Sequence, residues 1–207
     1  MKQVLFSIII SQTIILSQQA GVNIEWIQEY SSESLLKSAN GFDVDTDAAG
    51  NIYVTGEYYV EGGWYGVAVD YFTTKYDPSG SELWTSIYDG PSSVNDGARA
   101  LHVDALGNIY VTGFSEGGYA TLKYDTDGEQ LWCARYECDQ PPFGILSEAA
   151  EDIFVDDIGY TYVTGMVNGD YATIKYDAEG VQEWVAVYDG PSNGWDHAMA
   201  LVVDNSG

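Results

Sequence analysis

The sequence GNIYVTG at positions 107–113, followed by YATLKYD at 119–125 and then by Trp132, decides the fold of this chain. The pattern returns as GNIYVTG at 50–56 with Lys75 and Trp84, and as GYTYVTG at 159–165 with Lys175 and Trp184. The Lys and Trp positions step by 48 and then by 52 residues. Self-similarity at such a period is typical of repeat proteins, so we expect copies of one structural unit.

Each unit contains four short segments rich in β-branched and aromatic residues and separated by turn residues, which is the pattern of antiparallel strands. In the second unit these segments are 98–104, 108–113, 119–125 and 130–136. We therefore expect an all-β fold, a β-propeller of four-stranded antiparallel blades.

The strands are joined by Asp-x-x-Gly turns, in which Asp bonds its own backbone two residues on and Gly takes a positive φ. Such acids also occur in calcium loops, and Asp43, Asp45 and Asp47 are spaced like the start of an EF-hand. The segment does not match the EF-hand loop, because Ala48 and Val54 occupy the positions that require Gly and a bidentate Glu. We therefore expect plain hairpin turns, which begin at Asp47, Asp77, Asp104, Asp125, Asp156, Asp177 and Asp204.

Two side chains recur at fixed positions of the unit. A Trp lies four residues after a turn Gly, and we expect it to stack against the neighbouring unit together with the Tyr four positions further on. A Lys recurs in the third strand, and we expect it to be partly buried and paired with a carboxylate, because a buried ammonium group needs a partner. A Lys that extends along the blade edge into solvent is the alternative. These residues are Trp84, Trp132, Trp184, Lys75, Lys123 and Lys175.

The units resemble the bacterial SBBP-type β-propeller repeat, whose pattern is VDxxGNIYVTG followed by YATIKYDxxGxxxW. The resemblance covers residues 21–207 and implies a propeller in a secreted or surface-attached bacterial protein, usually without an assigned activity. This sequence departs from the pattern by an insertion between Gly56 and Lys75, by Glu137-Cys138-Asp139 in place of Asp-Gly-Pro, and by Tyr160 in place of Asn. A weaker likeness to the tryptophan-docking repeat of quinoprotein propellers gives an alternative relative.

The order of segments predicts an incomplete propeller. Residues 1–20 have the composition of a secretory signal peptide, and residues 24–30 match only the fourth strand of a unit, which would close the ring. Three units follow at about 39–90, 96–138 and 148–190, and residues 196–207 match the start of a fourth. We expect the chain to be the N-terminal part of a longer protein, whose remaining blades would be its partners.

Composition restricts the partners. The chain carries 32 acidic and 7 basic residues, a net charge of −25. Such a charge repels phosphate backbones and anionic membranes, so we expect no nucleic-acid binding. The apolar run near the N-terminus is too short to remain as a membrane span, and we expect the mature protein to be secreted or held at the outer cell surface.

The sequence contains no recognisable catalytic constellation. Its two histidines, His102 and His197, do not recur between units, and no nucleophile elbow, phosphate loop or zinc spacing is present. We expect a binding, adhesion or scaffold module and not an enzyme. The alternatives are the propeller part of an extracellular hydrolase or lyase acting on polysaccharide, or a quinoprotein-like propeller.

Exposed aromatic residues are the candidate ligand site. The insertion at 57–70 is rich in aromatic residues, and such side chains are favoured where sugars or peptides are recognised. A longer hairpin that packs on its own blade is the alternative. The candidate residues for an extracellular glycan or protein ligand are Tyr58, Tyr59, Trp64, Tyr65 and Trp195.

Three acids at the start of the first strands are the candidate metal ligands, namely Asp96, Glu148 and Asp196. We expect them to meet at the mouth of the central channel, where calcium, the one cofactor considered, would relieve their repulsion. The alternative is that each acid accepts backbone N–H bonds in its own inter-blade loop.

Cys133 and Cys138 flank the end of one strand and would lie about 16 Å apart on an extended chain, too far for a disulfide. We expect Cys133 to be free and buried.

Overall fold

The computed structural model describes residues 39–61, 67–91, 95–136, 149–192 and 194–204. Within these ranges the chain forms three four-stranded antiparallel sheets, in each of which the strands follow one another in chain order. The first sheet contains β1 (Ala39–Thr46), β2 (Ile52–Glu61), β3 (Val67–Tyr76) and β4 (Glu82–Tyr88). The second contains β5 (Asp96–Val103), β6 (Ile109–Ser115), β7 (Gly118–Tyr124) and β8 (Gln130–Tyr136). The third contains β9 (Ala150–Val155), β10 (Thr161–Val167), β11 (Asp170–Tyr176) and β12 (Gln182–Tyr188).

The all-β prediction is confirmed, and the strands expected in the second unit agree with β5 to β8 to within two residues at each end. The expected signal peptide at 1–20 and closing strand at 24–30 lie outside the described residues. In the part of the chain that the structure describes, no helix is long and apolar enough to cross a membrane.

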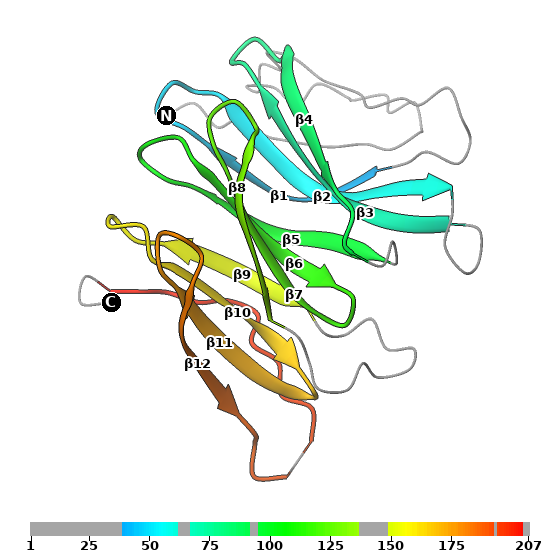
Figure 1. Ribbon diagram of the computed structural model, residues 1–207, viewed down its shortest axis with the longest axis vertical. Helices are drawn as coiled ribbons and strands as arrows, with labels where there is room; N and C mark the ends of the chain where they lie inside the picture. Colours follow the sequence, from blue (N-terminus) through cyan, green and yellow to red (C-terminus); the bar gives the residue numbers. More distant parts are fainter. Residues whose placement is uncertain (1–38, 62–66, 92–94, 137–148, 193, 205–207) are drawn as a thin grey trace, which may run out of the picture.

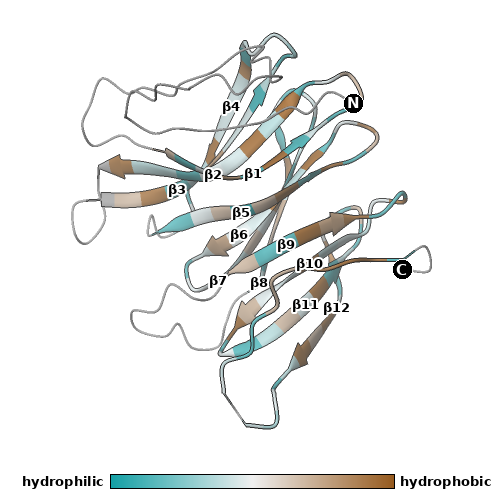
Figure 2. Ribbon diagram, turned by 180° about the vertical axis from the view of Figure 1, so that it is seen from behind, coloured by the Kyte–Doolittle hydropathy of each residue, from teal (hydrophilic) through white to brown (hydrophobic). Residues whose placement is uncertain are grey.

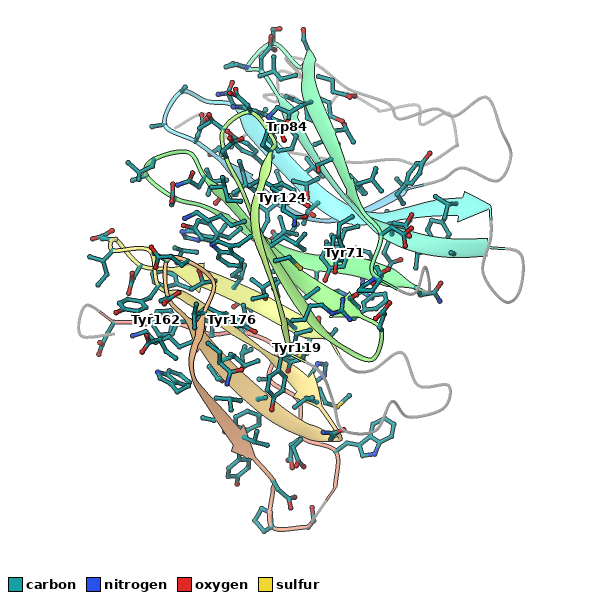
Figure 3. The ribbon with its side chains drawn as sticks, in the orientation of Figure 1. Tyr71, Trp84, Tyr119, Tyr124, Tyr162 and Tyr176 are labelled. Atoms are coloured by element: carbon teal, nitrogen blue, oxygen red, sulfur yellow. The ribbon has the colours of Figure 1, made fainter. Side chains whose placement is uncertain are left out.

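The three sheets lie face to face in chain order (Figure 1). Strand β5 packs against β1, β2 and β3, and β9 packs against β5 and β6. The apolar side chains therefore fill two layers between sheets. Tyr71 and Tyr124 belong to the layer between the first and second sheets, and Tyr119 and Tyr176 to the next layer (Figure 3).

Six of the seven predicted Asp-x-x-Gly segments are hairpin turns, and residues 205–207 of the seventh lie outside the described residues. In the turn at Asp104, the Gly107 N–H donates to the Asp104 carbonyl oxygen, and the carboxylate accepts from the N–H groups of Leu106 and Asn108 at 2.8 and 2.9 Å. These bonds satisfy the carboxylate inside its own turn. The same backbone bond closes the turns at Asp47, Asp77, Asp125, Asp156 and Asp177.

The repeated Trp joins neighbouring sheets. The indole N–H of Trp84 donates to the carbonyl oxygen of Thr126 at 3.1 Å, and that of Trp132 donates to Ala178 at the same distance. Both acceptors directly follow the turn Asp of the next sheet, and the ring covers the turn Gly. The predicted inter-unit packing is confirmed at both junctions. Trp184 packs on Tyr162 of its own sheet and is 42% exposed.

The repeated Lys does not have the partner that we expected. It is buried or half-buried, but within the described residues no carboxylate oxygen lies within 4.0 Å of any of the three ammonium groups. Each lies over a tyrosine ring instead, and Lys75 also donates to the Thr126 carbonyl oxygen at 3.0 Å. Aromatic rings, whose negative faces attract a cation, therefore take the position next to the ammonium group in which we expected a carboxylate. The pairs are Lys75 with Tyr53 at 5.3 Å, Lys123 with Tyr110 at 5.0 Å and Lys175 with Tyr160 at 3.9 Å from nitrogen to ring centre.

A second inter-sheet contact connects the first strands. The Asp43 carboxylate accepts the N–H of Leu101 at 2.8 Å, and the Asp152 carboxylate accepts that of Leu201 at 2.7 Å. Burial raises the pKa of Asp43 more than the backbone hydrogen bonds to its own carboxylate lower it. Leu201 is therefore held beside β9 by the same kind of bond that holds Leu101 beside β1.

The close contact between the Trp84 ring and Gly128 predicts that a methyl group added at Gly128 strongly lowers the stability of the protein. Gly128 has φ +85° and a Cβ there would lie 2.8 Å from the Trp84 ring, whereas Gly50, with φ +83°, has nothing nearer than 3.6 Å. Gly50→Ala should destabilise by about 1 kcal/mol, since only the strained φ opposes it. Gly128→Ala should cost about 1–3 kcal/mol more, because the ring must move.

Urea unfolding of the two variants measures the difference. Equal losses of stability would contradict a tight Trp84–Gly128 contact.

Candidate functional site

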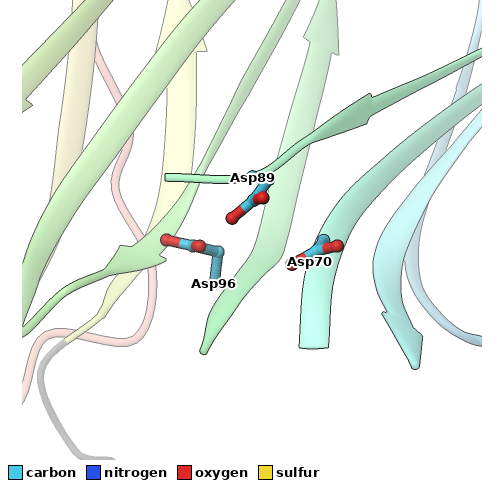
Figure 4. A group of neighbouring side chains, drawn as sticks. All are labelled: Asp70, Asp89 and Asp96. Atoms are coloured by element: carbon cyan, nitrogen blue, oxygen red, sulfur yellow. The ribbon is translucent and has the colours of Figure 1, made fainter. Parts of the chain in front are cut away.

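Three carboxylates gather at the junction of the first and second sheets. They belong to Asp70 of β3, to Asp89 directly after β4 and to Asp96 at the start of β5. One oxygen from each lies within 4.8 Å of the others. Figure 4 shows the Asp89 carboxylate above and between those of Asp70 and Asp96. The cluster therefore draws its side chains from two sheets and the loop that connects them.

Strand register and one backbone bond position these acids. Tyr71 pairs with Tyr88 across β3 and β4, so the next residues outward, Asp70 and Asp89, face each other at the end of the sheet. The chain then turns, and the Gly90 N–H donates to Asp96 Oδ2 at 2.9 Å. This bond ties the start of β5 to the residue that follows Asp89.

The environment of the cluster is unfavourable for three charges. Asp96 is fully buried, and its Oδ1 makes no hydrogen bond of normal geometry. Burial raises the pKa of Asp96 by more than the Ser115 hydroxyl and the Gly90 N–H lower it. Asp70 is 7% exposed, and burial together with the charges of Asp89 and Asp96 raises its pKa to about 6.

The nearest arginines have other partners. Arg135 lies 3.0 Å from the Glu116 carboxylate and also donates to Ser115 and Tyr88. Arg99 lies 2.8 Å from Glu57. Each guanidinium is therefore committed to an acid outside the cluster.

A second cluster repeats this arrangement at the edge of the third sheet. Asp170, Asp189 and Asp196 also bring one oxygen each within 4.8 Å of the others. The Gly190 N–H donates to Asp196 Oδ2 at 2.6 Å, as Gly90 does to Asp96. These acids are more exposed than those of the first cluster. At the intervening junction Gly118 takes the place of Asp70 and Asp170, so that junction lacks the first acid.

The geometry revises the expected grouping of metal ligands. Asp96 and Asp196 belong to separate clusters, each completed by two acids of the preceding sheet, and Glu148 lies outside the described residues. The third sheet lies between Asp96 and Asp196, which is why these two acids do not meet. Sequence reasoning missed Asp70 and Asp89, although one signal was present. In both clusters the three acids are spaced by 19 and then by 7 positions.

The predicted aromatic site is divided. The insertion extends the β2–β3 hairpin, in which Tyr58 and Tyr59 are half-buried. The Tyr59 hydroxyl accepts from Asn40 at 3.0 Å and donates to Glu57 at 3.4 Å, so it belongs partly to the packing of its own sheet. Trp64 and Tyr65 lie outside the described residues. Trp195 is 71% exposed.

The remaining polar candidates are not members of either cluster. His102 packs against Phe154 with 5.5 Å between ring centres, and His197 Nε2 lies 3.3 Å from Glu151. Cys133 is free, as predicted, but only half-buried, and its thiol contacts the Tyr88 hydroxyl at 3.7 Å. Burial raises the pKa of this thiol, which keeps it protonated. Cys138 lies outside the described residues.

Comparison with known proteins identifies no family for this chain. No family model and no curated protein matches the chain, so the SBBP resemblance stays a prediction. A crystal structure of a candidate gluconolactonase is similar at 15% identity and a TM-score of 0.38, over 71% of this chain and 47% of that protein. This chain thus spans about half of that protein's length. At this level of similarity no activity is transferred.

The raised pKa of Asp70 predicts a pH dependence of stability. Its folded value of about 6 exceeds the ordinary value of 3.8, so the folded protein holds this proton more tightly than the unfolded chain does. The contribution to stability is complete below pH 4 and is lost as pH rises through 6. In EDTA, the unchanged protein should lose stability between pH 4 and pH 7. In Asp70→Asn this loss should be smaller by roughly 1–3 kcal/mol.

Urea unfolding at both pH values measures this, with Asp127→Asn, an exposed acid on the opposite rim, as the control. Parallel pH profiles for Asp70→Asn and the unchanged protein would contradict the assignment.

Proposed function

We propose that this chain is part of a secreted or surface-attached β-propeller that serves as a binding and scaffold module. The observation that carries the proposal is the contact of a Trp with a turn of the next sheet, which occurs at both junctions between sheets. An Asp carboxylate that accepts a Leu N–H occurs at the first junction and again between β9 and Leu201. A contact that is built identically at each step adds sheets one after another, as propeller blades are added.

The third sheet supports a further blade. Its outward face exposes Trp184 and Tyr188, whereas the equivalent Trp132 and Tyr136 of the second sheet pack against the apolar layer that the third sheet covers. Figure 2 shows hydrophobic residues on β12 and on the C-terminal segment that lies beside β9. An exposed apolar face of this kind marks an interaction surface, and the bond from the Leu201 N–H to Asp152 supports the addition of a further sheet on that side.

The binding part of the proposal is supported by the rim that carries the acids. Trp195 lies on that rim beside the Asn168–Gly169 turn, and its neighbour Asp196 donates its N–H to Gly169 at 2.7 Å. A fixed, exposed indole can stack on a sugar ring. We propose an extracellular glycan as the ligand.

Addition of one blade tests the architecture. A polypeptide in which a copy of residues 105–136 follows Asp204 would complete a fourth sheet. Trp184→Ala should then cost about 3–5 kcal/mol, the usual loss for a buried Trp, but less than about 1 kcal/mol in the unextended chain, where the ring is exposed. Trp132→Ala, with its ring covered in both proteins, is the control. Equal effects of Trp184→Ala in the two proteins would contradict the blade-addition proposal.

Retardation in native gels that contain xylan, pectin or β-glucan tests the ligand class. The protein should be retarded by one of these polysaccharides, and Trp195→Ala should weaken the retardation at least tenfold, because stacking supplies much of the binding energy of such sites. Trp184→Ala is the matched control and should bind normally. Absence of retardation in all three gels, or full retardation of Trp195→Ala, would overturn glycan binding at this rim.

A further inference from the structure

The first acidic cluster has an oxygen that lacks a partner inside the protein. Asp96 Oδ2 accepts the Gly90 N–H, but Oδ1 of the same fully buried carboxylate accepts no hydrogen bond. Leaving a buried carboxylate oxygen unsatisfied is costly, and native proteins normally place a donor or an ion beside it. The same carboxylate contributes one of its oxygens to the group that includes oxygens of Asp70 and Asp89.

The charge of the buried Asp70 carboxylate independently indicates a bound ion. Asp70 is buried, and no hydrogen bond to its carboxylate is recorded within the described residues. Its two acidic neighbours raise the cost of its ionisation, and both nearby arginines are paired with Glu57 and Glu116. Buried charges that are not neutralised by protein groups are expected to be paired with an ion or to coordinate a metal.

The spacing of the oxygens fits a hard cation. Calcium binds oxygen ligands at 2.3–2.6 Å, so two ligands on opposite sides of the ion lie about 5 Å apart. All three oxygens lie within 4.8 Å of one another and can therefore belong to one coordination sphere. Carboxylates and water are the ligands that calcium prefers, and no nitrogen or sulfur ligand belongs to the group.

We propose that Asp70, Asp89 and Asp96 form a calcium site that clamps the first sheet to the second. The ion would neutralise the buried carboxylates and would join β3, the loop after β4 and the start of β5. It would act on the rim opposite to the Trp84 contact, so the two would hold the junction at both ends. The more exposed cluster of Asp170, Asp189 and Asp196 has the same arrangement of acids, and no sheet among the described residues covers it.

Calorimetric titration of the metal-free protein with calcium chloride tests the site. Asp70→Asn, which keeps the shape and removes one charge, should weaken the tightest binding event at least tenfold. Asp170→Asn, the matched change in the exposed cluster, and Asp127→Asn on the opposite rim should leave that event within about twofold, because neither residue belongs to the first cluster.

Thermal melting gives a second test, because Asp70→Asn should affect the melting temperature differently in EDTA and in calcium. In EDTA, Asp70→Asn should melt above the unchanged protein, because it relieves repulsion between carboxylates. In millimolar calcium the unchanged protein should gain roughly 5 °C, by linkage of the ion to the folded state, and Asp70→Asn should gain little.

Three results would overturn the proposal. They are a flat calorimetric titration, a melting temperature that does not respond to calcium, and tight binding that survives Asp70→Asn but is lost in Asp170→Asn.

Discussion

The contact of an indole ring with a glycine turn is the interaction on which the rest of the structure depends. A four-stranded sheet of this size cannot bury both of its faces by itself, so its stability comes from its neighbours. At each junction the indole N–H of Trp84 or Trp132 bonds a turn carbonyl oxygen in the next sheet, and the ring fills the space left by the turn Gly. The bond fixes position and the ring supplies buried apolar area, which together set how one sheet sits on the next.

This contact explains the unusual environment of the lysines. The carbonyl oxygen of Thr126 accepts from the Trp84 indole and also from Lys75, so the two side chains share one acceptor. The ammonium group lies over Tyr53, which stacks with the same Trp84. The Lys75 ammonium group thus has a carbonyl oxygen and a ring face as its partners, contacts that an argument from charge pairing alone does not include.

The acidic rim is the other consequence of the junction. At the first junction the Trp contact holds one end of the two sheets, and three acids lie close together where the opposite ends approach. Asp70 lies near the start of β3 and Asp96 begins β5, 26 positions later in the sequence. Their repulsion is acceptable to the folded protein because the covered apolar layer between the sheets is much larger than the cluster.

The sequence by itself determined the all-β class, the four strands of each unit, the Asp-x-x-Gly turns and the role of the Trp, because each of these follows from local spacing and strand periodicity. It also marked Asp96 as a candidate ligand. Only the tertiary structure decided which acids surround Asp96, since the pairing of Asp70 with Asp89 depends on strand register and that of Asp96 with both depends on the approach of two sheets. The partners of the repeated Lys were likewise decided in three dimensions, because the competing acceptors come from a turn of the next sheet and from aromatic rings on neighbouring strands.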